Sequence, residues 1–210
     1  MKLTLQECVD ILRVEIDGFP WTDRAAYADW LAQTYYYVSH STRLLASAAA
    51  RFGLDAAGNA LHNRFAAHMS EEKKHELLAL HDIKHLGYSL DRLPERPAAR
   101  MFYEPQYFKI EHESPMALFG YILPLEAAGP LLGRGVMANV TQAFGSSAAT
   151  FLKVHVNEDV DHLEKAFQML ESASSADRSF IERNMRQTTF AYRTMLQDIR
   201  HDGNVRAAAE

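Results

Sequence analysis

The histidines and carboxylates of this chain gather at separate places along the sequence, and the most regular set begins at residue 155. His155, Asp159 and His162 follow one another at intervals of four and three residues. At about 100° per residue of an α-helix, all three side chains project from one stripe that spans two turns. Two imidazoles and a carboxylate on one stripe form half of a metal site of the kind that bundles build from facing helices. The alternative is a solvated polar face, because Glu158 and Asp161 are adjacent in the sequence.

An earlier segment carries a second set of carboxylates and imidazoles. Glu71 and His75 are one helical turn apart, so both can reach the same ion from one face. Glu72 and His75 have the Glu-x-x-His spacing of di-iron bundles, so spacing alone leaves Glu71 and Glu72 open. His68 projects within about 20° of His75. The two lysines inside this segment favour the alternative of a charged, solvent-exposed face.

Glu126 stands in an apolar segment, residues 120–130. A carboxylate in such a helix must be paired, protonated or metal-bound to offset its desolvation, and a hydrogen-bonded core glutamate is the alternative to a ligand. Three segments together thus supply three carboxylates and three imidazoles, which suit two iron or manganese ions. The predicted metal ligands are Glu71, His75, Glu126, His155, Asp159 and His162.

Helical segments must position these residues. Thr22-Asp23, Asp55 and Ser114-Pro115 are typical helix starts, and Ser174 to Asp177 resembles a capping box. Apolar residues recur at three- and four-residue intervals, and no alternating stretch is long enough for a strand. The expected helical segments are 3–16, 22–52, 55–87, 114–145, 146–171 and 174–203.

Between two of these segments we expect a loop after Leu86-Gly87, in which Pro94 and Pro97 hold an extended path across the surface. The whole pattern predicts an all-α bundle that forms a single domain over residues 1–210, with a frayed tail at 203–210.

Composition excludes several classes of protein. The 210 residues carry a formal net charge of -5, which argues against nucleic acid or an anionic membrane as the main partner. The single cysteine, Cys8, fits a reducing compartment and excludes a cysteine-based zinc cluster. The most apolar stretch, 116–136, is interrupted by prolines, glycines and Glu126, which is unsuited to a membrane span. We therefore expect a cytoplasmic protein.

With these motifs the sequence resembles the heme-oxygenase-like diiron oxidases, which share a fold of about seven helices with heme oxygenase, thiaminase II and the pyrroloquinoline quinone synthase. The family pattern is a Glu and a His on one core helix, a Glu on a second, and His-x3-Asp-x2-His on a third. Glu71-Glu72-Lys-Lys-His75 is similar to the first part and Leu123-Pro-Leu-Glu126 to the second. His155-x3-Asp159-x2-His162 matches the third residue for residue. The family ligand is usually the first Glu of such a pair, so the resemblance favours Glu71.

The resemblance extends from about Trp21 to the last helix and implies a non-heme diiron oxidase or oxygenase. Its cofactor would be two Fe(II) ions, with manganese as an alternative, and O2 would be the co-substrate. The implied substrate is a small organic molecule, such as an amino acid, an amine or a fatty acid, and a homodimer and an external electron donor both stay open. No catalytic residue beyond the metal ligands is implied. Helical placement alone suggests four aromatic residues for the substrate pocket: Tyr35, Tyr36, Phe119 and Tyr121.

Differences from two related branches of the superfamily argue against their particular chemistry in this chain. The branch typified by the chlamydial death-domain-associated protein has a Lys ten residues after its second-helix Glu, where this chain has Val136. Thiaminase II uses a cysteine in the middle of its chain, which Cys8 does not match. Two alternatives remain: a metal-free helical protein that binds a small molecule or a partner, and a cofactor-less oxidase that resembles the pyrroloquinoline quinone synthase.

Overall fold

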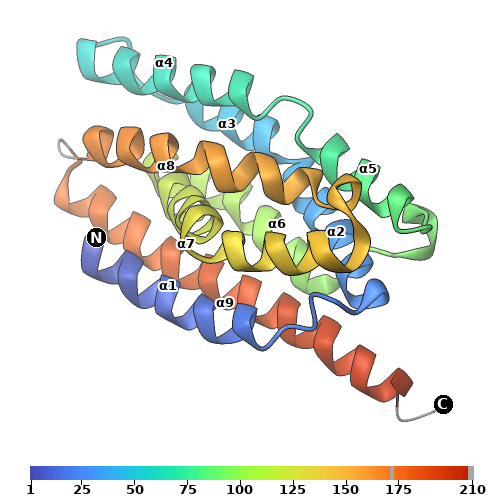
Figure 1. Cartoon of the computed structure of the whole chain (residues 1–210). Coiled ribbons are helices and arrows are strands. Elements are labelled where there is room, and N and C mark those ends of the chain that lie inside the picture. Colours follow the sequence, from blue (N-terminus) through green and yellow to red (C-terminus); the bar gives the residue numbers. More distant parts are fainter. Residues whose placement is uncertain (171–172, 208–210) are drawn as a thin grey trace.

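The computed structural model describes residues 1–170 and 173–207, with the backbone alone for 130–132, 157–165 and 203–207. This part of the chain folds into nine α-helices and three 3-10 helices, without a strand, so the predicted all-α class is confirmed (Figure 1). The α-helices are α1 (Lys2–Asp17), α2 (Arg24–Val38), α3 (Ser41–Ala49), α4 (Ala56–Glu71), α5 (Glu76–His85), α6 (Pro97–His112), α7 (Phe119–Phe144), α8 (Thr150–Leu170) and α9 (Ser175–Ala207). The 3-10 helices are η1 (Leu90–Arg92), η2 (Pro115–Leu118) and η3 (Ser146–Ala148).

Helix starts are set where the sequence predicts them. The side chains of Asp23 and Asp55 each accept a hydrogen bond from the N–H three residues further on, at 2.8 and 2.7 Å. Ser174 Oγ does the same at 3.1 Å and caps α9. These bonds satisfy N–H groups that the first turn of a helix leaves without a partner.

Two segments expected as continuous helices are each divided. Residues 22–52 form α2 and α3, separated at Ser39 and His40. Residues 55–87 form α4 and α5, and the break at 72–75 contains Lys74 with a φ of 73°. A residue in this left-handed region cannot continue a right-handed helix. The break therefore changes the direction of the chain between Glu72 and His75.

Helix α6 lies where the sequence predicts an extended loop, and that part of the expectation is wrong. Pro97 occupies the first turn of α6, where its fixed φ suits a helix and its missing N–H costs nothing. Within the expected loop, the part before Pro97, which contains Pro94 and η1, lies outside α-helices.

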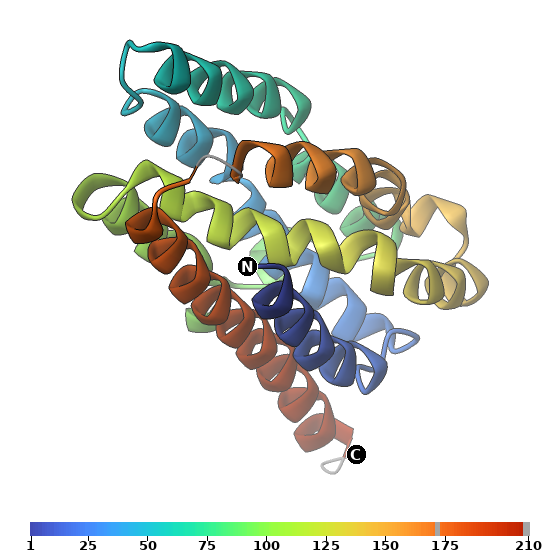
Figure 2. The same cartoon turned by 90° about the vertical axis from the view of Figure 1, so that its left-hand side faces the viewer.

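Helix α7 runs through the middle of the bundle (Figure 2). It packs against α8 on one side and against α1 and α9 on the other, while α3 and α4 form a pair at the edge. At Gly120 a Cβ atom would collide with the carbonyl oxygen of Ile181, so glycine permits the close approach of α7 to α9. Helix α8 thus contacts both α7 and α5, the helix that follows the α4–α5 junction.

In the described part of the chain, no single helix is long and apolar enough to cross a membrane. One bent pair, Pro115–Gly129 and Gly133–Phe144, meets that test by length and composition only, with 56° between its halves.

Candidate metal centre

Asp82 on α5 fixes the helix that carries the most regular motif. Its carboxylate is fully buried and accepts the Phe151 N–H at 2.9 Å, while Thr150 Oγ hydrogen-bonds to its other oxygen. Asp82 thereby caps the start of α8 from a different helix. This contact holds the start of α8 against α5. It therefore helps to fix the position of His155 on α8 relative to His75, which directly precedes α5.

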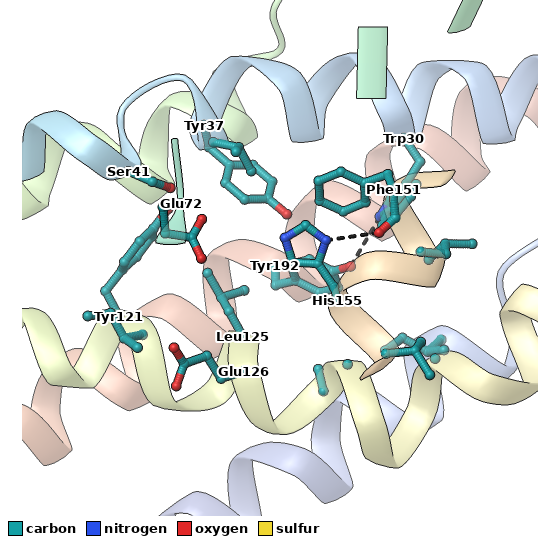
Figure 3. A pocket seen from close by; sticks show the side chains of 18 of the residues that line it. Trp30, Tyr37, Ser41, Glu72, Tyr121, Leu125, Glu126, Phe151, His155 and Tyr192 are labelled. Carbon is teal, nitrogen blue, oxygen red and sulfur yellow. Dashed lines mark hydrogen bonds between the residues drawn. The ribbon is translucent and has the colours of Figure 1, made fainter. Parts of the chain in front are cut away.

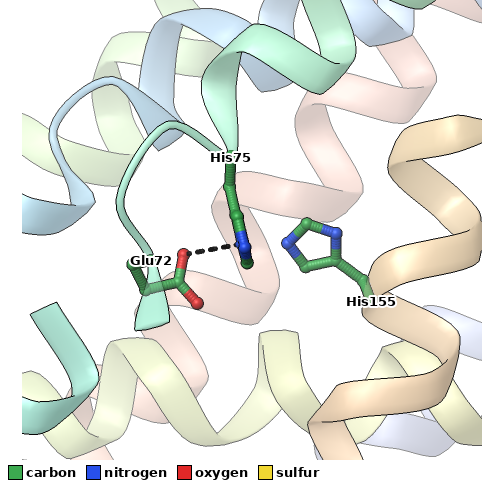
Figure 4. Close-up of side chains that lie close together, drawn as sticks. All are labelled: Glu72, His75 and His155. Carbon is green, nitrogen blue, oxygen red and sulfur yellow. Dashed lines mark ion pairs between the residues drawn. The ribbon is translucent and has the colours of Figure 1, made fainter. Parts of the chain in front are cut away.

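Glu72, His75 and His155 converge at the α4–α5 junction (Figure 4). One ligand atom from each residue lies within 4.8 Å of the other two. The His75 Nδ1 atom is 3.6 Å from Glu72 Oε2, and the two imidazole rings are 5.1 Å apart at their centroids. This is the one group of three or more histidine, cysteine, aspartate or glutamate side chains at metal-binding distances among the described residues.

The ring of His155 is held in one tautomer. Its Nδ1 lies 2.9 Å from the Phe151 carbonyl oxygen, which only accepts, so Nδ1 carries the proton. The Phe151 ring also stacks on the imidazole, with centroids 4.1 Å apart. Nε2 is therefore the nitrogen that keeps its lone pair, as a metal-ligating histidine requires.

Glu126 and His68 extend the centre toward α7. The Glu126 residue is 7 % exposed, and its Oε1 is 3.2 Å from His68 Nε2. The same nitrogen is 3.5 Å from Glu72 Oε1. His68 thus lies between the buried Glu126 carboxylate and the partly buried Glu72 carboxylate, in the place that a cation is expected to take.

The electrostatic balance keeps Glu72 charged. Burial by itself raises the pKa of the Glu72 carboxyl, but hydrogen bonds from His68 and His75 outweigh burial and hold this pKa well below its usual range. A carboxylate that stays deprotonated in a buried position is a suitable ligand for a divalent cation.

The structure places the predicted ligands as follows. His75, His155 and Glu126 lie at the centre, but Glu72 rather than Glu71 belongs to the converging group. Glu71 Oε2 is 3.3 Å from Arg64 Nη1 on the same helix. The side chains of Asp159 and His162 lie outside the described residues, although their backbone continues α8 beyond His155.

Two residues at the centre were missing from the predicted ligand set. Spacing alone leaves Glu71 and Glu72 open, and the family resemblance favours Glu71. His68 had a signal, because its angular position on a helix is close to that of His75. The break at residues 72–75 carries no glycine or proline that would have indicated it.

A cavity of about 150 Å3 opens beside the centre. Glu72, Glu126 and His155 contribute to its wall, and Trp30, Phe151 and other large apolar side chains supply most of the rest (Figure 3). Of the four aromatic residues expected to contact a substrate, Tyr121 lines this cavity. The structure places the other three aromatic residues elsewhere. Tyr36 donates to the Leu93 carbonyl at 3.1 Å and packs on Tyr35, and Phe119 packs on Phe65.

The donor set suits iron or manganese. Imidazole nitrogen and carboxylate oxygen are the ligands these ions accept, and the described ones arise from the α4–α5 junction, α7 and α8. The fold and this cluster together define a class: helical bundle proteins with a candidate metal site between facing helices.

Comparison with known proteins then identifies the family. The model of the iron-containing redox enzyme family matches residues 28–192, so the chain belongs to that family. The family that the sequence motifs indicate is therefore confirmed as iron-containing redox enzymes. No match is found among the curated proteins.

Solved structures share the fold. A domain of unknown function with a heme oxygenase-like fold from Shewanella denitrificans superposes with a TM-score of 0.77 at 20 % identity, over 100 % of this chain and 92 % of that one. A TenA homolog from Pseudomonas syringae pv. tomato gives a TM-score of 0.77 at 11 % identity, over 94 % and 91 % of the two chains. At these identities the likeness shows the fold, and the heme-oxygenase-like architecture is confirmed.

Proposed function

We propose that this chain is a non-heme diiron oxidase or oxygenase that uses O2 to oxidise a small organic substrate. The observation that carries the proposal is the convergence of Glu72, His75 and His155 at the end of an apolar cavity. Membership of the iron-containing redox enzyme family supports iron as the metal, with manganese as the alternative. Two ferrous ions would supply electrons for the reduction of O2, and an external donor would restore them.

The proposed ligand set joins the described cluster to two further residues of α8. Glu72 takes the place that the sequence pattern gives to Glu71, because it is the carboxylate beside His75. The proposed ligands are Glu72, His75, Glu126, His155, Asp159 and His162. Glu126 would supply a carboxylate to the ions from α7.

The protein would contribute positioning and a dry environment. The Phe151 carbonyl orients the His155 ring, and Asp82 fixes the start of the helix that carries it. The carboxylates of Glu72 and Glu126 offset cationic charge inside the bundle. The apolar wall excludes water from the place where a substrate would lie. Of the substrate classes that the family resemblance implies, an amino acid, an amine or a fatty acid, each needs room for an apolar body beside the metals.

Substitution of the α8 motif tests the proposal. The His155→Ala and Asp159→Ala variants should each lose bound iron, measured by elemental analysis, and iron-dependent O2 uptake. His62→Ala is the matched control, because His62 lies on α4 and hydrogen-bonds to the Ala49 carbonyl, away from the centre. Full iron content and full O2 uptake in both α8 variants would contradict the proposal.

One observation favours a second candidate function. His68 contacts both Glu72 and Glu126, so an imidazolium could balance the two carboxylates without a metal. The chain would then be a metal-free protein that binds a small molecule or partner, or a cofactor-less oxidase. Fe(II) titration separates these alternatives, because in both of them added iron leaves O2 uptake unchanged.

A further inference from the structure

The cavity beside the metal centre restricts the part of a substrate that can enter it. Its volume of about 150 Å3 is similar to that of an engineered apolar cavity that takes up benzene. Leu44, Leu118 and Ile122 line it together with the aromatic residues Trp30 and Phe151. A single aromatic ring or a branched alkyl group therefore fits this volume.

The charges of the cavity wall argue against an anionic group in this space. The acidic and basic side chains among its described lining residues are the carboxylates of Glu72 and Glu126 and the imidazoles of His68 and His155. No lysine or arginine is among the described residues that line it. A buried anion without a counter-charge pays a large desolvation cost, and the two carboxylates would add repulsion.

Tyr121 supplies one polar contact to this apolar space. The residue is 4 % exposed, and its hydroxyl is buried without a hydrogen-bond partner among the described groups. In Figure 3 its side chain reaches from α7 toward Ser41 and Glu72 on the opposite wall. Burial, with the charge of Glu72 adding to it, raises the pKa of this phenol well above its usual value. The hydroxyl therefore keeps its proton and can donate.

Tyr192 also lines this cavity, and its hydroxyl has a hydrogen-bond partner. Its oxygen accepts the Trp30 indole N–H at 3.1 Å. Buried hydroxyl groups normally have such a partner, and an orphaned one costs free energy until a partner arrives. Both residues are buried and both line the cavity, but the Tyr192 hydroxyl has a partner, whereas the Tyr121 hydroxyl has none among the described groups.

We infer that the substrate places a compact apolar group without a negative charge in this cavity and that this group accepts a hydrogen bond from the Tyr121 hydroxyl. The chemical class is an aromatic or branched aliphatic group that bears one carbonyl, ether or similar acceptor. The inference deepens the proposed function and rests on it for the reaction, but the binding itself needs no iron.

Three probes of nearly the same shape test the inference on the metal-free, full-length protein by isothermal titration calorimetry. Acetophenone carries an acceptor, isopropylbenzene carries none, and benzoate carries a charge. We expect acetophenone to bind, and benzoate to bind at least about 100-fold more weakly. Tyr121→Phe should weaken acetophenone binding by about 5- to 10-fold and change isopropylbenzene binding by less than about twofold.

Two further variants control this result. Tyr103→Phe removes a phenol that bonds to Glu95 outside the cavity, and it should leave both affinities unchanged. Ala128→Leu adds bulk to the cavity wall and should abolish acetophenone binding, while thermal unfolding shows that the variant is folded. Equal affinities for benzoate and acetophenone would overturn the inference. So would equal effects of Tyr121→Phe on the two neutral probes, binding that survives Ala128→Leu, or no binding of any probe.

The outcomes separate this inference from the proposed function. Acetophenone binding without iron uptake would overturn the diiron proposal alone. Iron uptake with iron-dependent O2 consumption, but without probe binding, would overturn the inference about Tyr121 alone.

Discussion

Two carboxylate sites in the interior of this bundle differ in the groups that their oxygens contact. Asp29 on α2 meets the guanidinium of Arg96, with Nη2 at 2.6 Å and Nε at 3.1 Å from its Oδ2. Gln33 donates to its other oxygen at 2.8 Å. At the candidate metal centre, Glu72 and Glu126 instead contact imidazole nitrogens at 3.2 to 3.6 Å.

The difference separates a structural carboxylate from a ligand. An arginine fork is always charged and gives a carboxylate short, fixed bonds, so Asp29 is satisfied when the chain folds. Imidazoles can lose their protons and become ligands, so Glu72 and Glu126 share their surroundings with groups that can turn to a metal ion. Substitutions at the two sites should therefore affect different properties.

The largest expected effect is on iron binding at Glu72. Glu72→Gln should lower Fe(II) affinity by more than about 100-fold, because a neutral amide replaces a charged ligand at the centre. Glu71→Gln is the matched control and should stay within about threefold, since Glu71 pairs with Arg64. Anaerobic Fe(II) titration of both variants measures the difference. A greater loss in Glu71→Gln would instead assign the ligand to Glu71, the glutamate that the family resemblance favours.

Asp29→Ala should have the converse effect. Removal of Asp29 leaves the partly buried Arg96 guanidinium with Asp202 as its remaining acidic partner. We expect this change to lower the free energy of unfolding by about 2 kcal/mol. Urea denaturation measures this change. The folded variant should still bind the same number of irons as the parent. Loss of iron from folded Asp29→Ala would show that the two sites are coupled.

A smaller effect is expected at the cap of α8. Asp82→Ala should lower stability by about 1 to 2 kcal/mol and reduce iron affinity by about tenfold, because α8 loses its anchor to α5. Asp55→Ala removes a similar cap from α4 and should cost comparable stability with iron affinity nearly unchanged. Calorimetry and iron titration on the two variants compare them. Equal iron affinities would contradict the positioning role of Asp82.

The smallest effect is a pH dependence in the metal-free protein. Since its surroundings hold the pKa of Glu72 below the unfolded value, this carboxylate stabilises the fold fully above about pH 4.5. The contribution is lost as the pH falls through the lower pKa of the folded state. The stability difference between the parent and Glu72→Gln should therefore shrink on acidification below that range. A difference that grows on acidification would contradict the assigned sign.

The sequence predicts the frame of this molecule well where local chemistry is decisive. Helix starts at Asp23, Asp55 and Ser174 depend on side-chain caps that can be recognised in a single sequence. The positions of His155 and Glu126 follow from helical periodicity and from the cost of a buried carboxylate. These features predict two of the side chains at the centre, one from α8 and one from α7.

Other features depend on the tertiary structure. The choice between Glu71 and Glu72 follows from the break at Lys74, whose left-handed φ has no signal in the residue type. The sequence analysis places Pro97 in a loop, whereas it begins α6. Proline is common both in loops and in the first turn of a helix, and the residue type alone does not distinguish the two. Apart from Tyr121, the cavity wall was not predicted, because periodicity does not show which neighbouring helix a side chain faces.

The most direct test of the central claim is anaerobic Fe(II) titration of the metal-free protein, followed by rapid mixing with O2. We expect two irons bound per chain and O2 consumption that follows the amount of bound iron. Glu72→Gln should show neither, whereas Glu71→Gln should show both. Absence of iron binding in the parent protein, or O2 consumption independent of iron, would contradict the account.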